Sequence, residues 1–219
     1  MAAELTIDEL LTTTRSIRRR LDLDSPVDLD VIEDCLRIAL QAPSGSNEQP
    51  YRWILVTDPE VRAELGRLYL DAFNERRARA AAAGSPAAPA AVADEARARM
   101  MRSSAYLAEN LARVPVHIIP CVRSYMPDHP VDTELISATR YASVFPGVWN
   151  LQLALRSRGY GSCLTTLHLM RHEQAAELLQ IPADYAQACL VPVAKLLGDD
   201  NFTQAPRKPL ASVLGRNRF

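Results

Sequence analysis

The sequence has 219 residues, of which 48% are hydrophobic and 23% charged, and its formal net charge is −1 at pH 7. These values are typical of a folded globular protein, and the near-zero charge excludes a global electrostatic attraction to nucleic acid or to an anionic membrane. No apolar run is long enough to span a bilayer, and Glu4, Asp8 and Glu9 lie where a signal peptide would be basic and then apolar.

The four cysteines also limit the class of protein. Cys35, Cys121, Cys163 and Cys189 are far apart and lack the Cys-x-x-Cys spacing of zinc sites. Scattered thiols fit a reducing compartment better than a disulfide scaffold. We therefore expect a cytoplasmic protein with no metal site, no nucleic-acid partner and no membrane contact.

Two helices are predicted near the start of the chain. Apolar residues at helical spacing predict the first over residues 7–20. The second follows Asp28, whose side chain can cap it, and its apolar stripe continues to Leu40. Pro43 ends this helix because proline cannot continue it.

A short apolar strand is predicted at 53–57, and Asp58-Pro59 then begins a helix with aspartate as the cap and proline in the first turn. From Arg76 to Arg99 the composition becomes alanine-rich around Gly84-Ser85-Pro86. This segment has two interpretations. We favour two helices with a flexible joint, because alanine carries no chemistry. The alternative is a mobile lid over a substrate pocket, since such gates are drawn from weakly packed segments.

Five elements are predicted in the second half: a strand at 114–122, a helix at 133–158, a strand at 161–166, a helix at 171–179 and a strand at 188–194. The long helix is apolar on most sides between Val144 and Leu155, which predicts burial partly against another subunit. Residues 201–219 are expected to form an extended tail that wraps a partner. Helices around a small mixed β-sheet, in a single domain over 1–219, define an α+β fold.

Two polar segments carry the candidate chemistry. In Thr14-Arg15-Ser16-Ile17-Arg18-Arg19-Arg20, four arginines surround one serine. Taken alone, the run is more typical of a solvated face, but planar guanidinium groups bind phosphate bidentately. In Pro43-Ser44-Gly45-Ser46-Asn47-Glu48-Gln49, hydroxyl and amide groups suit a heterocycle with several carbonyls and ring nitrogens. Together the segments predict a phosphorylated, ring-bearing cofactor.

Two further motifs follow, Gly159-Tyr160-Gly161-Ser162-Cys163-Leu164-Thr165-Thr166 and Arg207-Lys208-Pro209-Leu210. The four motifs, in this order, resemble the nitroreductase family of flavin mononucleotide (FMN) enzymes, and the resemblance covers nearly the whole chain. It implies a nitroreductase-like fold and a homodimer with FMN in two sites at the subunit interface. It further implies NADH or NADPH as hydride donor and a small aromatic acceptor. A deazaflavin is an alternative cofactor.

The resemblance also implies roles for individual residues. Arg18 would place a cation near flavin N1 and the C2 carbonyl, where it would stabilise the reduced anion and raise the reduction potential. A backbone N–H of Thr166 or Thr165 would face N5, the atom that exchanges hydride. The other cofactor-binding residues implied are Arg15, Ser16, Pro43, Ser44, Ser46, Asn47, Gln49, Ser143, Phe145, Pro146, Leu164, Arg207 and Lys208.

Three positions depart from the family pattern. Thr14 stands where the family often has arginine, so Arg19 or Arg207 would supply that phosphate contact. Leu167 and His168 stand where glycine or a carboxylate is frequent. His168 is a candidate proton donor, although a lone histidine is more often structural.

The implied reaction is a ping-pong transfer of hydride from NAD(P)H, through flavin N5, to a nitroaromatic or quinone-like acceptor. One alternative is other chemistry on the same flavin, either reductive dehalogenation or breakdown of the flavin itself. Another is a flavin-binding or sensing protein without turnover. NADH and NADPH are not distinguished, because the sequence offers no identifiable residue that reads the ribose or its phosphate.

Overall fold

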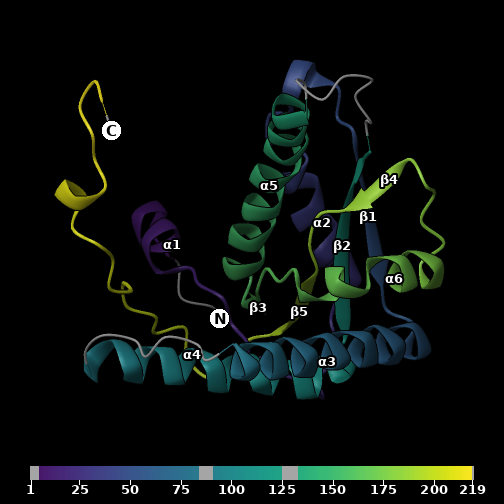
Figure 1. Cartoon of the computed structure of the whole chain (residues 1–219), viewed down its shortest axis with the longest axis horizontal. Helices are drawn as coiled ribbons and strands as arrows, with labels where there is room; N and C mark the ends of the chain where they lie inside the picture. Colours follow the sequence, from purple (N-terminus) through teal and green to yellow (C-terminus); the bar gives the residue numbers. More distant parts are fainter. Residues whose placement is uncertain (1–4, 84–90, 125–132, 219) are drawn as a thin grey trace.

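The computed structural model describes residues 5–83, 91–124 and 133–218 (Figure 1). The helices are α1 (Ile7–Thr13), α2 (Leu29–Ala39), α3 (Pro59–Ala82), α4 (Ala91–Asn110), α5 (Thr133–Arg156) and α6 (His172–Leu178). The strands are β1 (Tyr51–Val56), β2 (Val116–Arg123), β3 (Tyr160–Ser162), β4 (Tyr185–Gln187) and β5 (Val191–Lys195). Short 3-10 turns are η1 (Gly45–Asn47), η2 (Leu111–Arg113), η4 (Leu167–Arg171) and η5 (Leu210–Ser212).

The strands form one sheet in the order β1-β2-β5-β3. Strands β5 and β4 both pair with β2: β5 pairs with its first residues, 116–118, and β4 with its last, 121–123. Every pairing between these strands is antiparallel, so the α+β class is confirmed but the expectation of a mixed sheet is wrong. The reason lies in the connection between β1 and β2. Two long helices, α3 and α4, lie side by side, so the chain runs out and back and re-enters the sheet from the end it left (Figure 1).

Helices cover both faces of the sheet. Residues alternate along β2, so that Ile118 packs in one core with Ile32 of α2 and Leu151 of α5. Its neighbour Ile119 packs in a second core with Leu65 of α3. The sheet is therefore the middle of three layers, with α2 and α5 on one side and α3 on the other.

The predicted caps of α2 and α3 are present. The Asp28 carboxylate accepts a hydrogen bond from the Asp30 N–H, and the Asp58 carboxylate accepts from Glu60 and Val61 N–H groups. Pro59 is in the first turn of α3. These features follow from local chemistry, because a carboxylate before a helix satisfies amides that have no acceptor within the helix.

The first helix is shorter than the predicted 7–20 and ends at Thr13. The hydroxyls of Thr12, Thr13 and Thr14 donate to the carbonyl oxygens four residues earlier, which competes with the continuing helical pattern. The chain then runs extended beside the sheet, because the Ile17 N–H donates to Ser162 O at 2.9 Å. The arginine run is therefore an extended segment at the sheet edge.

Helix α5 confirms the long helix predicted at 133–158, but only part of its surface is buried. Val148 and Leu151 are fully buried, whereas Trp149 is 41% exposed and Tyr141 39% exposed. Burial of this helix against another subunit stays a prediction, and the exposed side chains of Trp149 and Tyr141 are where it would occur. Within the described ranges, none of the helices combines the length and apolar character that a bilayer crossing requires.

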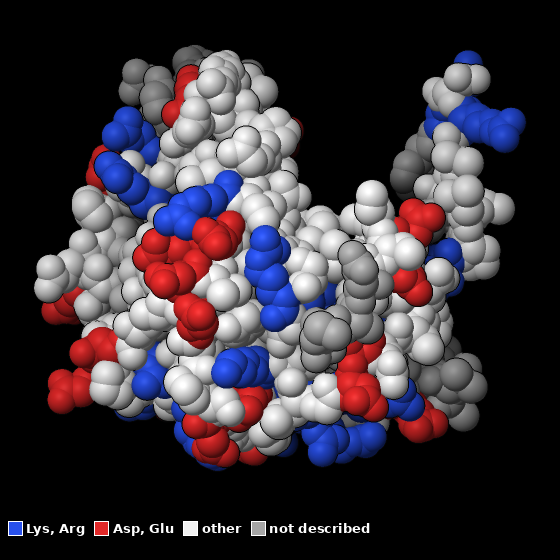
Figure 2. Space-filling view, turned by 180° about the vertical axis from the view of Figure 1, so that it is seen from behind, with Lys and Arg blue, Asp and Glu red and all other residues white. Residues whose placement is uncertain are grey.

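The alanine-rich segment contributes to two helices, α3 and α4, as we favoured. The expected joint between them lies at 84–90, outside the described residues. The tail is extended apart from η5, and Figure 2 shows it as an arm that projects from the body and carries basic side chains at its end. On the face in Figure 2, acidic and basic side chains are interspersed.

Candidate functional site

A cavity of about 780 Å³ lies between the α3–α4 pair and the segment that follows β3. It brings together residues from four parts of the chain: the arginine run, both long helices and the motif at 159–166. Its lining residues are Arg18, Tyr69, Phe73, Arg76, Arg77, Ala80, Arg97, Met100, Met101, Ser104, Thr165, Thr166 and Leu167.

Arg18 reaches this cavity because its neighbours fix the extended run against β3. Ile17 is 5% exposed, and a Cβ atom on Gly161 would lie 2.9 Å from the Ile17 side chain, so only glycine allows this approach. Arg18 is half-buried and its positive charge lies near the buried Cys163 thiol, whose pKa is raised to about 12 by burial against the opposing effect of Arg18. The guanidinium is thus a positioned cation at the inner end of the cavity.

The two threonines predicted near N5 have different backbone partners. Thr165 N–H donates to Leu190 O at 2.9 Å, and Leu190 N–H donates back to Thr165 O at 2.8 Å. The Thr165 amide is therefore used by the sheet, and its assignment as a hydride-site donor is wrong. Within the described part of the chain, the Thr166 N–H has no hydrogen-bond acceptor, and Thr166 is exposed to the cavity.

Tyr69 was not among the predicted site residues. Its phenol is buried and hydrogen-bonds Thr165 Oγ1 at 2.9 Å, and burial raises the pKa of Tyr69. The hydroxyl consequently stays protonated at neutral pH and fixes Thr165 beside Thr166. Helical spacing would have indicated this residue only if the cavity side of α3 had been known.

The other lining residues missed from sequence form two helical stripes. On α3 they recur from Tyr69 through Phe73, Arg76 and Arg77, and on α4 from Arg97 through Met100, Met101 and Ser104. Spacings of three and four residues place each set on one face of its helix. The two helices therefore line one side of the cavity. A lid over the cavity would occupy the same position.

The amide-rich turn has a strained backbone. Ser46, Asn47 and Gln49 have φ angles of 49°, 52° and 49°, in the left-handed region that residues other than glycine rarely adopt. The turn is held by Gln49 N–H, which donates to Ser44 Oγ at 3.1 Å, and by Gln49 Nε2, which donates to Asn47 Oδ1 at 3.2 Å. Such strain costs about 1–3 kcal/mol per residue and clusters at ligand-binding sites.

This turn does not reach the cavity of its own chain. Gly45 N–H donates to Ser143 Oγ at 3.0 Å, whereas Gln152 Nε2 donates to Ser162 Oγ at 3.4 Å beside the arginine run. Ser143 and Gln152 are nine residues apart on α5, or about 13 Å along the helix axis. The turn and the run therefore lie at different levels of α5 (Figure 1).

Three predicted residues lie on α5 itself. Ser143 is buried; it donates to Thr139 O at 2.8 Å and accepts from Gly45, so its hydroxyl positions the turn. Phe145 is half-buried and stacks on Tyr141, with ring centroids 5.6 Å apart. Pro146 is half-buried within the helix. All three lie at the turn's level of the helix.

Arg15 and Arg20 hold the beginning of the tail. Arg15 Nη2 donates to Thr203 O, and Arg20 Nε donates to Leu197 O at 2.8 Å. The Phe202 ring lies within 5.3 Å of the guanidinium carbons of Arg15, Arg20 and Arg156, the nearest being Arg156 at 4.6 Å. Cation–π contacts therefore fix the tail beside the arginine run.

Arg156 anchors this arrangement and was missed from sequence. It is 2% exposed, its Nε donates to Asp200 Oδ2 at 2.8 Å and its Nη2 donates to Thr13 Oγ1 at 3.2 Å. A buried charge requires such partners. The pair ties the end of α5 to both α1 and the tail, but an arginine at a helix end gives no sequence signal of burial.

The remaining predicted residues lie at the surface. Pro43, Ser46, Asn47 and Gln49 are exposed, as are Ser16, Arg207 and Lys208, whereas Ser44, Leu164 and Thr14 are half-buried. Among the described residues, the acceptor of Arg207 Nη1 is its neighbour Pro206 O at 3.2 Å. Neither Arg207 nor Lys208 lines the cavity in the single chain.

His168 does not fit the role of a proton donor. It is fully buried, does not line the cavity, and neither ring nitrogen has a hydrogen-bond partner among the residues that the structure describes. Burial, with a smaller effect of nearby His117, lowers the pKa of His168 to about 4, and burial likewise lowers the pKa of His117 to about 4. Both rings are therefore neutral at pH 7, and the structural interpretation of His168 is supported.

These two rings predict a pH dependence of stability. Between pH 6.5 and about 4 the unfolded chain binds protons that the folded chain does not, so the free energy of unfolding falls as pH is lowered through this window. Below about pH 4, each ring lowers the free energy of unfolding by on the order of 3 kcal/mol relative to its value at neutral pH. In urea titrations across this range, His168→Leu should have a shallower pH slope than the wild type, and the exposed-residue control His172→Gln an unchanged one. An unchanged slope in His168→Leu would contradict this account.

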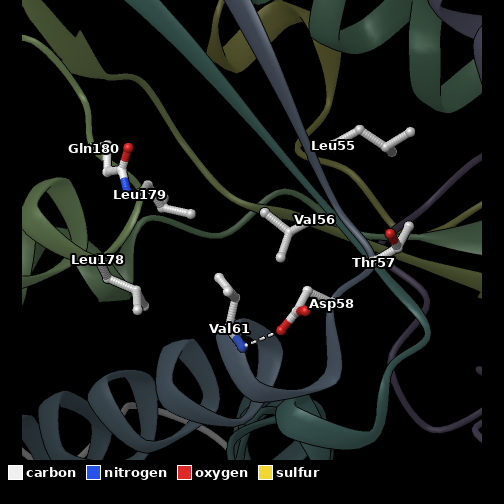
Figure 3. A pocket seen from close by; sticks show the side chains of 8 residues that line it. All are labelled: Leu55, Val56, Thr57, Asp58, Val61, Leu178, Leu179 and Gln180. Atoms are coloured by element: carbon white, nitrogen blue, oxygen red, sulfur yellow. Dashed lines mark hydrogen bonds between the residues drawn. The ribbon is translucent and has the colours of Figure 1, made fainter.

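A second cavity, of about 290 Å³, lies at the end of β1 and contains none of the predicted residues (Figure 3). It is lined by Val56 and Thr57, the start of α3 and the Leu178–Gln180 segment. Its one carboxylate, Asp58, accepts hydrogen bonds from the first turn of α3. This hollow therefore offers no available charged group.

The described residues contain no cluster of three or more histidine, cysteine or acidic side chains that could bind a metal ion. All four cysteines are buried and free. The cavity residues instead fit a flavin, because Arg18 supplies a fixed cation and Thr166 an amide donor. The strained turn, with its exposed amides and hydroxyls, lies outside this cavity on another surface of the chain.

Comparison with known proteins identifies the fold. The family model described as "Nitroreductase family" matches residues 11–195, most of the chain. The chain belongs to the nitroreductase family. Family membership agrees with the α+β fold described above. It also gives the general class of enzyme, because members of this family are flavoprotein oxidoreductases.

Individual relatives of this nitroreductase-family chain differ in activity. Iodotyrosine deiodinase of Drosophila melanogaster is 42% identical over 57 residues, which are 26% of this chain and 20% of the deiodinase. A crystal structure of iodotyrosine deiodinase bound to FMN and 3-iodo-L-tyrosine has a TM-score of 0.69 at 20% identity, covering 98% of this chain and 100% of that one. NADPH:FMN oxidoreductase from Vibrio harveyi, complexed with NAD⁺, has a TM-score of 0.67 at 20% identity, with 97% and 77% covered.

Proposed function

We propose that this nitroreductase-family protein is an FMN-dependent NAD(P)H oxidoreductase that reduces nitroaromatic or quinone-like acceptors. The observation that carries the proposal is the cavity where Arg18 and the unpaired Thr166 amide meet. When bound, FMN would accept a hydride at N5 and pass it to the acceptor. The similar Vibrio harveyi enzyme binds NAD⁺, which supports a nicotinamide donor.

The overall reaction balances without an acid–base residue of the protein. A nitroaromatic takes two electrons and two protons: ArNO₂ + NAD(P)H + H⁺ gives ArNO + NAD(P)⁺ + H₂O. A quinone with the same reductant gives the hydroquinone. Solvent can supply the proton through the open side of the cavity, where Arg76 and Arg97 are exposed.

The protein's own groups would bind and orient the ring. The Arg18 guanidinium would lie near the pyrimidine edge, where negative charge develops, and this fixed charge lowers the energy of the anionic state. The Thr166 N–H would donate to the ring edge, and the Tyr69–Thr165 hydrogen bond would hold that backbone in place. Arg15 and Arg19 would bind the phosphate, with Arg207 or Lys208 from the tail.

The site would be completed by a second copy of the chain. The amide turn and the arginine run lie at different levels of α5, and between them α5 carries the half-buried Phe145 and the exposed Trp149. A two-fold pairing through this face would bring the turn of one protomer to the run of the other. The exposed tail residues Leu210, Val213 and Leu214, each more than half exposed, would also be covered by a partner.

The absorbance spectrum of the purified protein tests the proposal. We expect a yellow protein, or one that turns yellow on addition of FMN, whose flavin is bleached anaerobically by NADH or NADPH and recovers with a nitro compound or quinone. A protein that binds FMN but oxidises neither donor would be the non-catalytic flavin-binding alternative. A protein that binds a deazaflavin but not FMN would change the cofactor and keep the site.

A second candidate is supported by the similarity to iodotyrosine deiodinase in both sequence and fold. Reductive dehalogenation on the same site also balances: ArX + NAD(P)H gives ArH + NAD(P)⁺ + X⁻. Release of iodide from 3-iodotyrosine, measured beside reduction of a nitro compound under the same conditions, separates the two candidates. Faster halide release than nitro reduction would favour the dehalogenase.

A further inference from the structure

The outer part of the cavity is strongly basic. Arg76 and Arg77 from α3 and Arg97 from α4 line it, and no aspartate or glutamate is among the described lining residues. Glu75, next in sequence, is bound to Arg171 at 2.5 Å and to Arg79, so its charge is directed to groups outside the cavity. Exposed basic side chains gathered on one wall attract anionic ligands, and salt screens this attraction.

The same wall is apolar between the arginines. Met100 and Met101 are 47% and 41% exposed, and the Arg77 guanidinium lies 5.7 Å from the centre of the Phe73 ring. Methionine and aromatic surfaces pack well against flat rings. The wall therefore suits a ligand that is both aromatic and anionic.

The dimensions agree with a single substituted ring. Tyr69, beside Thr165 at the inner end, and Arg76 are seven residues apart on α3, or about 10 Å along the axis. One ring that carries a reducible group and an acid group can span this length. On the described outer wall, Ser104 is the one residue with a hydroxyl or amide side chain, so this wall offers more to an acid group than to the ribose hydroxyls of the NAD(P)H donor.

We propose that the acceptor is an aromatic compound bearing a carboxylate or sulfonate, whose anionic group is bound by Arg76 and Arg77 while its ring lies against Phe73 and the two methionines. This inference rests on the proposed function. The acid group takes no part in the redox step and is unchanged by it, while the nitro group takes the two electrons and two protons as written above.

The test compares 4-nitrobenzoate with its methyl ester on the FMN-loaded protein. Binding is measured without NAD(P)H, from the change in flavin absorbance, and turnover by stopped-flow reoxidation of the reduced protein. We expect the carboxylate to bind and react about tenfold better than the ester, since charge-assisted hydrogen bonds are the stronger ones. Because these arginines are exposed, raising the salt concentration should shrink the preference.

The Arg76→Gln/Arg77→Gln double variant should lose this preference and keep wild-type kinetics with the ester. Glutamine keeps the helix propensity of α3. The matched control is the Arg79→Gln/Arg99→Gln double variant, which also removes two positive charges, one from α3 and one from α4, outside the cavity lining, and should keep the preference.

The outcomes separate this inference from the proposed function. Preferential binding of the carboxylate without any turnover supports the anion-binding role of the arginines and contradicts the proposed function. Equal binding and turnover of acid and ester overturn the inference and keep the function. If the double variant slows only flavin reduction by NAD(P)H, the arginines bind the donor's phosphates, and the inference is likewise overturned.

Discussion

Arg18→Ala should weaken FMN binding at least tenfold and slow flavin reduction by about the same factor or more. Arg18 is a half-buried cation at the inner end of the cavity, beside Thr166, and its removal takes a charge-assisted hydrogen bond from the ring. It also removes the positive charge that stabilises the reduced anion, so the reduction potential of any flavin retained should fall. Calorimetric FMN titration and anaerobic stopped-flow reduction measure both effects.

Arg19→Ala is the matched control for the rate of flavin reduction, because Arg19 is the next residue in the same run, is exposed and does not line the cavity. We expect its flavin to be reduced at nearly the wild-type rate, with at most a loss of phosphate affinity. An Arg18→Ala protein that stays fully yellow and turns over at the wild-type rate would refute the role given to Arg18.

Trp149→Arg should convert the protein to a monomer and remove bound FMN from both sites at once. Trp149 is 41% exposed on the apolar face of α5. In a two-fold dimer both protomers carry the new arginine, so two positive charges are added to the same contact and repel each other. Light scattering after size exclusion measures the mass, and the ratio of visible to ultraviolet absorbance measures retained flavin. Circular dichroism should remain that of the folded chain, since the changed side chain lies outside the core.

Thr57→Arg is the control for the added charge, because Thr57 is an exposed residue at the end of β1, beside the second cavity (Figure 3). It should remain dimeric and yellow. A monomeric Trp149→Arg protein that binds FMN with wild-type affinity would mean that one chain holds the whole site.

Local features of the fold were predictable from the sequence because they depend on neighbouring residues. Asp28 and Asp58 are predictable as helix caps, because an acidic side chain directly before an apolar helical stripe accepts hydrogen bonds from the N–H groups of the first turn. The C-terminal end of α1 is not predictable from the apolar pattern. Three threonine hydroxyls compete with the helix, and the Ile17 N–H donates to Ser162 O of β3 instead of to a helical carbonyl. The antiparallel sheet depends on the paired course of α3 and α4, which no local pattern encodes.

The candidate site divides in the same way. Arg18 and Thr166 carry motif signals and line one cavity. The Thr165 amide has the same motif signal but is bound to Leu190, a partner 25 residues away that only the sheet register defines. Arg76, Arg77 and Arg97 have the sequence appearance of solvated helix faces, and only the pairing of α3 with α4 gives them a shared cavity.

The central claim is that Arg18 of one protomer and the amide turn of its partner form one flavin site, and subunit mixing tests it most directly. An Arg18→Ala chain is combined with an Asn47→Gly/Gln49→Gly chain, in which glycine keeps the left-handed backbone and removes both amides. Each variant alone should retain little FMN. After random reassociation, half of the dimers are mixed and each has one intact site, so about a quarter of the wild-type FMN should return. If the mixture binds no more FMN than its components, both segments act within a single chain and the shared site is contradicted.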